Sequence, residues 1–313
     1  MVSSRAPWKP SLLLAATLWA ALMAGAAQAD AYCRTSVCNG SVVGTVCEPP
    51  RADDCGIALY WTGRCVGFSV QEDASAKVPW EVADSIAVEA FDTWSRAVCD
   101  GGQGPSIEGV DLGPVECAAR EYNQSGGNAN LLVFRDDLWP YAGQWNTLAL
   151  TTVTYNLDTG EIYDADLEIN SANVDLTWSD TDVGYDLPSI VTHEVGHVLG
   201  LAHASGADAT MYSDYQRTST TLRDLAPDDI AGICAIYPPG PPRSSLPCDP
   251  TPRHGFKSDC GPGPAEEEGC SVSTATGSTS TERGWPPWAA LLGWLLILRR
   301  TARRRRGARP TGP

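Results

Sequence analysis

Three of the four histidines in this 313-residue chain fall within eleven residues, His193 to His203, which read HEVGHVLGLAH. On a helix, His193 and His197 are four positions apart, so their imidazoles project from one face toward a common point. Glu194 is offset by one position, where its carboxylate can act as a general base beside a metal ion instead of binding it. Gly200 allows the helix to stop and the chain to reverse, which brings in His203 as a third nitrogen ligand.

This spacing predicts a catalytic zinc site, because three protein ligands leave the fourth position open for water. Neutral imidazoles leave the metal its full charge, which lowers the pKa of the bound water from about 15.7 toward 7. That water would attack a carbonyl carbon, and Glu194 would pass the proton to the departing amine. The alternative is a helix with scattered core histidines, and the register of the glycine and the third histidine argues against it.

The elements around this motif alternate between strand and helix patterns. Helices are predicted over residues 79–98, 187–199 and 227–237, from apolar residues at helical spacing and from proline or acidic residues at their starts. Strands are predicted at residues 58–70, 106–112, 130–134, 148–155 and 161–170, and the last two flank a hairpin turn that ends at Gly160. This order predicts an α+β fold with a mixed sheet and helices on one side.

The predicted strand at residues 161–170 alternates apolar residues with Asp164, Asp166, Glu168 and Asn170. Alternation of this kind favours a strand with one face in solvent. Calcium binding by the carboxylate oxygens is the alternative that we retain.

The extended histidine motif resembles that of the metzincin zinc peptidases, in which a Met-turn follows it. Thr210-Met211-Tyr212 supplies that turn, and Met211 lies eight residues after His203. This short spacing is similar to the matrixin, or matrix-metalloproteinase-like, branch. The segment at 227–237, with Asp228 and Asp229, resembles the closing helix of that branch.

The resemblance covers residues 57–237 and implies a metzincin fold. That fold is a twisted mixed sheet with an antiparallel edge strand, an active-site helix, a Met-turn and a C-terminal helix. The implied activity is that of a zinc metalloendopeptidase of the EC 3.4.24 type. Its protein or peptide substrate would pair as an added strand with residues 148–155.

The same resemblance implies roles for single residues. His193, His197 and His203 would hold the catalytic zinc, Glu194 would be the base, and Met211 would lie beneath the metal. Calcium is an additional candidate cofactor, and a second zinc is not expected because no suitable histidines remain. A catalytically silent surface adhesion protein that keeps zinc for stability is the rival hypothesis, and the presence of Glu194 argues against it.

Cysteine usage and the N-terminal residues indicate an exported protein. Residues 1–29 combine basic residues, an apolar run and a small-x-small ending, as a signal peptide does, and a membrane anchor is the weaker alternative. Residues 30–56 are predicted to form a cysteine-rich lead-in. Eleven cysteines suggest five disulfides and one special thiol, Cys270. Spacing leaves the connectivity open, although Cys248 and Cys260 could close a local loop.

The C-terminal part is predicted to hold a linker and a sorting tail. Nine of the 27 residues from Pro238 to Pro264 are proline, so residues 238–269 are predicted to form a stiff linker. Residues 270–313 combine Cys270, a polar spacer, a short apolar run and an arginine cluster, and they resemble the sorting tails of myxobacterial surface proteins. Cell-envelope sorting machinery is therefore an expected partner. A plain anchor through a transmembrane helix at residues 285–298 is the alternative, although 14 residues are short for a bilayer.

Charge narrows the set of partners. Residues 30–270 contain 12 basic and 37 acidic side chains, a net charge of −25. Such a surface repels phosphate, so no nucleic-acid partner is expected. The prediction is a monomer at the cell surface or outer envelope, or one released outside the cell.

Overall fold

A computed structural model describes residues 32–37, 57–143, 146–259 and 271–277. All of them lie in one unit, Met1–Ser278. The predicted signal peptide, most of the cysteine-rich lead-in, Cys270 and the C-terminal apolar run therefore lie outside the described residues. Within the described ranges, no helix is long and apolar enough to cross a bilayer.

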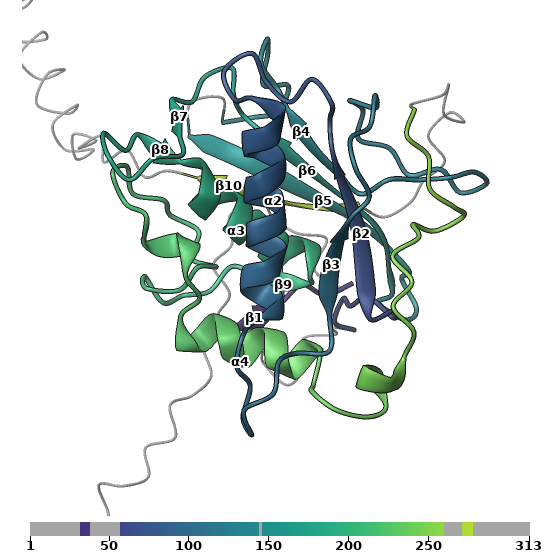
Figure 1. The fold of residues 1–313 in the computed structure, drawn as a ribbon. Coiled ribbons are helices and arrows are strands. Elements are labelled where there is room, and N and C mark those ends of the chain that lie inside the picture. The colour runs from purple at the N-terminus through teal and green to yellow at the C-terminus, as the bar shows by residue number, and fades with distance from the viewer. Residues whose placement is uncertain (1–31, 38–56, 144–145, 260–270, 278–313) are drawn as a thin grey trace, which may run out of the picture. The chain divides into compact units, whose positions relative to one another are not determined.

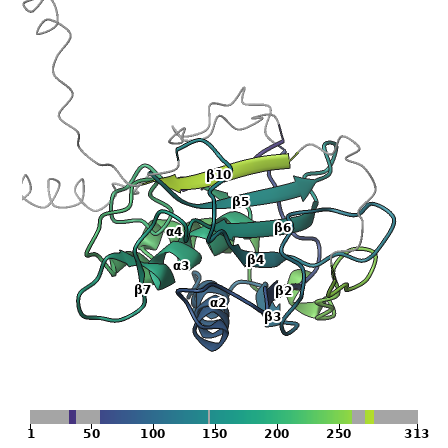
Figure 2. The same cartoon turned by 90° about the horizontal axis from the view of Figure 1, so that it is seen from above.

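A six-stranded sheet with the strand order β10-β5-β6-β4-β2-β3 forms the centre of the fold (Figure 2). Strands β3, β2, β4 and β6 run parallel, whereas β5 is antiparallel to β6, and β10 is antiparallel to the other side of β5. The predicted mixed sheet is thus confirmed. Its strands are β2 (Cys65–Val70), β3 (Glu108–Asp111), β4 (Leu131–Phe134), β5 (Thr147–Tyr155), β6 (Ile162–Ile169) and β10 (Ser271–Gly277). Two short ribbons pair β1 (Cys33–Arg34) with β9 (Leu201–Ala202) and β7 (Leu176–Thr177) with β8 (Tyr185–Asp186).

The helices α2 (Trp80–Ser95) and α3 (Leu187–Val198) lie in front of the sheet in Figure 1. Helix α2 packs on β2 and β3, and α3 packs on β5 and β6 and against α2. Pro79 directly precedes α2, and apolar residues at helical spacing give it one buried face. The third predicted helix is α4 (Pro227–Ile236), and short 3-10 turns occur at Thr221–Arg223 and Arg243–Ser245.

The hairpin between β5 and β6 has the geometry expected from its turn residues. Gly160 has φ of +75°, and a Cβ at this position would lie 2.4 Å from the carbonyl oxygen of Ala58. Glycine is needed here for both reasons, since other residues rarely adopt a positive φ and a side chain has no space.

The polar face of β6 is buried, so the expectation of a solvated face is wrong. Strand β4 and the residues on either side of it supply donors to this face. Asp166 accepts hydrogen bonds from the backbone N–H groups of Leu131 at 3.0 Å and Glu121 at 3.1 Å, and Glu168 pairs with Arg135. Alternation alone cannot distinguish these protein donors from water, because both satisfy polar groups. All four polar side chains are at most 2% exposed: Asp164, Asp166, Glu168 and Asn170.

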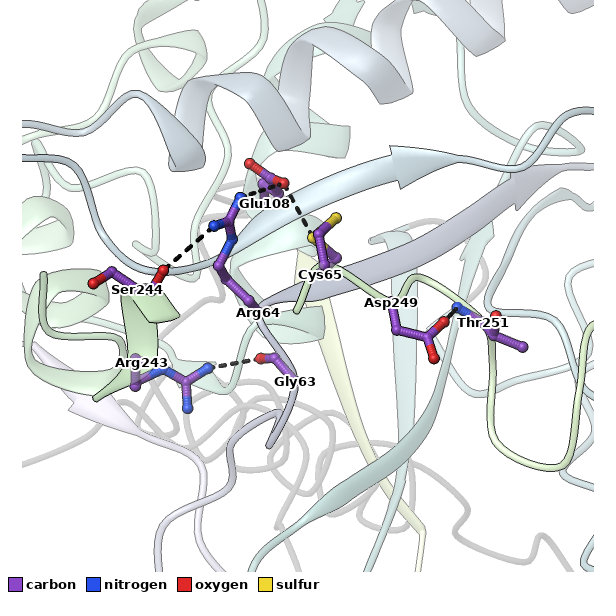
Figure 3. Close-up of a disulfide and its surroundings, with 9 residues drawn as sticks. Gly63, Arg64, Cys65, Glu108, Arg243, Ser244, Asp249 and Thr251 are labelled. Carbon is purple, nitrogen blue, oxygen red and sulfur yellow. Dashed lines mark hydrogen bonds and ion pairs between the residues drawn. A yellow bond between two sulfur atoms is a disulfide. The ribbon is translucent and has the colours of Figure 1, made fainter. Parts of the chain in front are cut away.

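The proline-rich residues that follow α4 are attached to the rest of the fold as far as residue 259. A disulfide joins Cys248 to Cys65 at the start of β2, so Cys248 does not form the local loop considered with Cys260 (Figure 3). In the same region, Arg243 donates to the carbonyl oxygen of Gly63 at 2.7 Å. The disulfide and this hydrogen bond hold the proline-rich residues against the start of β2.

A second disulfide joins the residues that follow α2 to α4, through Cys99 and Cys234. Cys33 is also disulfide-bonded, and so is Cys117. Disulfides are thus present among the described cysteines, as the cysteine count suggested.

Candidate metal centre

Helix α3, which carries His193 and His197, has a fixed starting point. Asp186 precedes it and accepts a hydrogen bond from the backbone N–H of Ser189 at 3.0 Å, and Pro188 occupies the first turn. An acidic residue and a proline at the start of this helix were predicted from the sequence. The Asp186 carboxylate, which is fully buried, also accepts from Nε of Arg223 at 2.8 Å. The ion pair balances the charge of this buried cap.

The end of α3 turns the chain back toward the metal ligands. Gly200 has φ of +94°, and a Cβ there would lie 2.7 Å from the carbonyl oxygen of Leu59. Two aromatic donors satisfy carbonyls that the last turn leaves open. Trp61 Nε1 donates to the carbonyl of Val198 at 2.8 Å, and the Tyr237 hydroxyl donates to that of Leu199 at 2.9 Å.

The three histidines converge. One ligand atom from each of His193, His197 and His203 lies within 4.8 Å of the others. His193 and His197 are at most 1% exposed, and His203 is 4% exposed. The two histidines of the helix and the one that follows it therefore converge on one buried point, as their spacing predicted.

Hydrogen bonds to backbone carbonyls define the tautomers of His193 and His197. Nδ1 of His193 lies 2.6 Å from the carbonyl oxygen of Thr210, and Nδ1 of His197 lies 2.8 Å from that of Leu201. A carbonyl oxygen only accepts, so both Nδ1 atoms carry the proton and both Nε2 atoms carry a lone pair.

The Nε2 atoms of His193 and His197 lie 3.1 Å apart. Two lone pairs at this separation repel each other, and neither nitrogen has a proton to share. The Nε2 atom of His203 is also buried and has no hydrogen-bond partner among the described residues. A cation between the three nitrogens removes both conflicts.

Burial keeps these imidazoles neutral. Desolvation, with a smaller contribution from His203, lowers the pKa of His193 to about 3. Desolvation lowers the pKa of His203 to about 4, and burial holds the pKa of His197 well below its ordinary value. Neutral imidazoles are the form that binds metal, so no proton has to be displaced at neutral pH.

The donor set fits zinc. Zinc binds imidazole nitrogen at about 2.0–2.1 Å in tetrahedral sites, so two of its ligand nitrogens lie about 3.3 Å apart. The 3.1 Å between the two Nε2 atoms is close to this value. One other group of ligating side chains converges among the described residues, Cys65, Glu108 and Cys248, and its two sulfurs are joined in the disulfide.

Glu194, the predicted base, is fully buried beside the triad in α3. Its Oε2 atom accepts a hydrogen bond of 2.6 Å from the Thr151 hydroxyl, and Thr151, in the middle of β5, is also fully buried. Hydrogen bonds to a buried carboxylate are short and strong, so this contact orients the carboxylate. The sequence carried no signal for Thr151, because the contact joins residues 43 positions apart.

Met211 packs directly against the metal-binding helix. A Cβ added at Gly196 would lie 2.2 Å from the Met211 sulfur and 2.7 Å from the ring of Trp94. Gly196 is therefore required for the close approach of the turn to the helix. Met211 is 1% exposed, and its position beneath the metal stays a prediction.

Asp229 holds the Met-turn in place. Its two carboxylate oxygens accept from the backbone N–H groups of Thr210 at 2.7 Å and Met211 at 3.1 Å. It also caps α4 by accepting from the backbone N–H of Ala226 at 2.9 Å. The acidic first turn of α4 was recognised in the sequence, but this second role depends on a segment 18 or 19 residues earlier.

Comparison with known proteins identifies a related family. Residues 131–238, which include the histidine triad and the Met-turn, match the family profile described as matrixin. A matrixin domain implies the metzincin fold, and the mixed sheet observed here is consistent with it.

Three relatives illustrate the similarity. Neutrophil collagenase of Homo sapiens is 43% identical over 24% of this chain and 18% of its own length. Metalloendoproteinase 1-MMP of Arabidopsis thaliana is 36% identical over 33% of this chain and 27% of its own length. Matrilysin of Mus musculus is 29% identical over 61% of this chain and 67% of its own length. The match thus spans only about a fifth to a quarter of the first two relatives. Together with the match to residues 131–238, these similarities support a matrix-metalloproteinase-like family for this chain.

Proposed function

We propose that this chain is a zinc-dependent endopeptidase that hydrolyses peptide bonds in protein substrates. The observation that carries the proposal is the convergence of three buried imidazoles, two with their lone pairs turned to a common point, beside a buried glutamate. A structural zinc site is closed by four protein ligands and needs no base. The family similarity supports the same conclusion.

In this proposal, His193, His197 and His203 hold the metal. The carbonyls of Thr210 and Leu201 fix the two helical rings in the metal-binding tautomer, so no rotation is needed when the ion binds. When bound, zinc acts as a Lewis acid, which lowers the pKa of water and polarises the scissile carbonyl.

Glu194 moves the proton. Its carboxylate accepts a proton from the attacking water and delivers it to the nitrogen of the departing amine. Thr151 donates to Oε2 and thereby orients the carboxylate. Met211 packs on Gly196, between the two helical histidines, and excludes bulk water from that side of the helix.

Glu194→Ala tests the assignment of the base. We expect the variant to retain zinc and to lose casein hydrolysis by about two to four orders of magnitude. The control is Glu81→Ala, which removes an exposed glutamate of α2 and should leave the rate unchanged. Undiminished hydrolysis by Glu194→Ala would refute the role of Glu194, and a parent protein that holds zinc but cleaves nothing would favour the silent adhesion protein.

Calcium is a separate candidate cofactor at the acidic face of β6. Oδ1 of Asp164 is buried there without a hydrogen-bond partner among the described residues. No three carboxylates of the described residues converge, so an ion at this place would need backbone or water oxygens as well. Metal analysis of protein dialysed against calcium, with Asp164→Asn as control, would decide this question.

We also propose that the protein is exported and kept as a monomer at the cell envelope through residues 270–313. The signal-peptide pattern, the disulfides and the sorting-tail pattern support this. Cys270 would be the anchoring residue, and sorting machinery would be the partner. Mass spectrometry of the mature protein tests the proposal, because an unmodified Cys270 would contradict anchoring at this residue.

A further inference from the structure

Strand β10 (Ser271–Gly277) lies along the outer edge of β5 (Figure 2). Seven residue pairs define the contact, from Ser271 opposite Thr154 to Gly277 opposite Thr147. Strand β10 also lies close to α3, the helix of the histidine motif. This segment, about 70 residues after the motif, thus lies at the edge of the sheet that is next to the motif's helix.

The pairing of β5 with β6 shows which backbone groups of β5 face β10. The carbonyl of Leu148 accepts from the N–H of Asn170, so the backbone groups of Leu148 point toward β6. Successive residues of a strand point their N–H and C=O groups to opposite sides. The groups of Ala149, Thr151 and Val153 therefore point outward, toward β10.

This parity identifies the residues of β10 that complete the ladder. Thr274 is opposite Thr151 and Val272 is opposite Val153, so both form hydrogen-bonded pairs. Ser273 is opposite Thr152 and forms a pair without hydrogen bonds, with its own N–H turned away from β5.

The centre of β10 is level with the metal centre. Thr274 pairs with Thr151, and Thr151 is the residue whose hydroxyl holds the Glu194 carboxylate. An extended substrate that adds a strand to β5 needs the same donors and acceptors of Ala149, Thr151 and Val153. Strand β10 and such a substrate cannot bind at the same time.

The chain between residues 259 and 271 is long enough for β10 to pair within one molecule. The carbonyl oxygen of Ser258 accepts a hydrogen bond from the backbone N–H of Glu116. Glu116 lies beside the end of β2, because its neighbour Val115 pairs with Gln71. Strand β2 is four strand spacings from β10. Four spacings amount to about 19 Å. The eleven intervening residues, 260–270, reach up to about 40 Å when extended.

We infer that the outer edge of β5 is a docking surface for the chain's own residues 271–277, and that this segment competes with substrate for the cleft. The inference rests on the proposed peptidase function. Because the segment is tethered, its effective concentration at the edge is on the order of millimolar, which no dilution of the protein reduces. Activity therefore depends on release of β10 from β5.

Two proline variants of the full-length, zinc-loaded protein test this inference. Thr274→Pro removes an N–H that bonds to β5, whereas Ser273→Pro places the same ring one residue away, where the N–H faces outward. We expect Thr274→Pro to raise kcat/KM on a protein substrate about threefold to tenfold, the effect of losing one net backbone hydrogen bond from the closed state. Ser273→Pro should behave as the parent protein.

Hydrogen exchange gives a readout that does not depend on activity. The backbone amides of Ala149, Thr151 and Val153 should be protected in the parent and in Ser273→Pro, and should exchange faster in Thr274→Pro. Equal exchange in all three proteins would overturn the inference even if the enzyme is active. Absence of proteolysis in every variant, with the exchange difference present, would instead refute the peptidase function and leave the docking intact.

Concentration dependence separates pairing within one chain from pairing between two copies. For pairing within one chain, protection of the three amides is the same at low and high protein concentration. Protection that disappears on dilution, together with dimers in sedimentation, would overturn the inference in favour of an exchange of β10 between molecules.

Discussion

The hydrogen bond from Thr151 to Glu194 makes a quantitative prediction about catalysis. Thr151→Val removes the hydroxyl and preserves the shape of the side chain, so Oε2 loses a donor at 2.6 Å. Both residues are fully buried, so water does not readily replace the lost donor. A hydrogen bond to a charged group contributes about 1.5–3 kcal/mol.

Only part of this energy applies to the reaction, because Glu194 keeps other interactions. We therefore expect kcat to fall about tenfold to fiftyfold, at 1.36 kcal/mol for each factor of ten. KM should change less than twofold, because the substrate's backbone contacts with β5 are retained. Thr151→Ser restores the hydroxyl and should recover most of the rate.

The assay is steady-state cleavage of a fluorogenic peptide, with zinc content and thermal unfolding measured on each variant. Equal zinc content would exclude loss of metal as the cause. The reasoning is refuted if Thr151→Val retains kcat within twofold of the parent, or if Thr151→Ser is as slow as Thr151→Val. The second result would indicate a packing defect at this position and not a lost donor.

Three further predictions concern stability. Gly196→Ala places a methyl group 2.2 Å from the Met-turn sulfur and should lower the free energy of unfolding by about 1–3 kcal/mol in urea, whereas Gly206→Ala, where no atom lies within 4 Å, should not. Replacement of Cys99 and Cys234 by serine removes a disulfide that closes a loop of 135 residues, and should lower the free energy of unfolding by about 3–5 kcal/mol. A loss of less than about 1 kcal/mol would contradict the role of loop closure. Burial and repulsion from Asp166 raise the pKa of Asp164 well above 3.8. The folded state therefore binds this proton more tightly than the unfolded state, and the free energy of unfolding falls as pH rises through the raised pKa. Asp164→Asn should therefore unfold at a higher temperature than the parent at pH 8 and show a flatter pH dependence, and a lower unfolding temperature at pH 8 would contradict the sign.

Local spacing was sufficient to predict most of the fold and the central part of the site. Helix geometry places residues four apart on one face, so His193 and His197 converge wherever the helix lies. The helix ends were equally local, since Asp186 and Gly200 act through their own backbone neighbourhood. The five predicted strands correspond to β2 to β6, because alternation and turn residues are also properties of short segments. The bounds of β3 to β6 agree to within two residues, whereas β2 begins at Cys65, seven residues after the predicted start.

Burial depended on the tertiary structure. The polar residues of β6 alternate as they would on a solvated strand, yet they are buried, and the backbone N–H groups of Glu121 and Leu131 take the place of water at Asp166. The path of the proline-rich residues likewise follows from Cys65, 183 positions before Cys248, and not from their composition. A pattern of residue types records which groups need polar partners, but it does not record where those partners come from.

The amino-acid sequence by itself predicted which side chains hold a metal ion and which one moves a proton, because the whole motif lies within eleven adjacent residues. The tertiary structure decided how those groups are oriented and what lies beside them. Thr151 holds Glu194 from 43 residues away, and residues 271–277 lie along β5 more than a hundred residues after it. Contacts between such distant segments form when strands pair and loops close, and neither process leaves a local pattern in the chain.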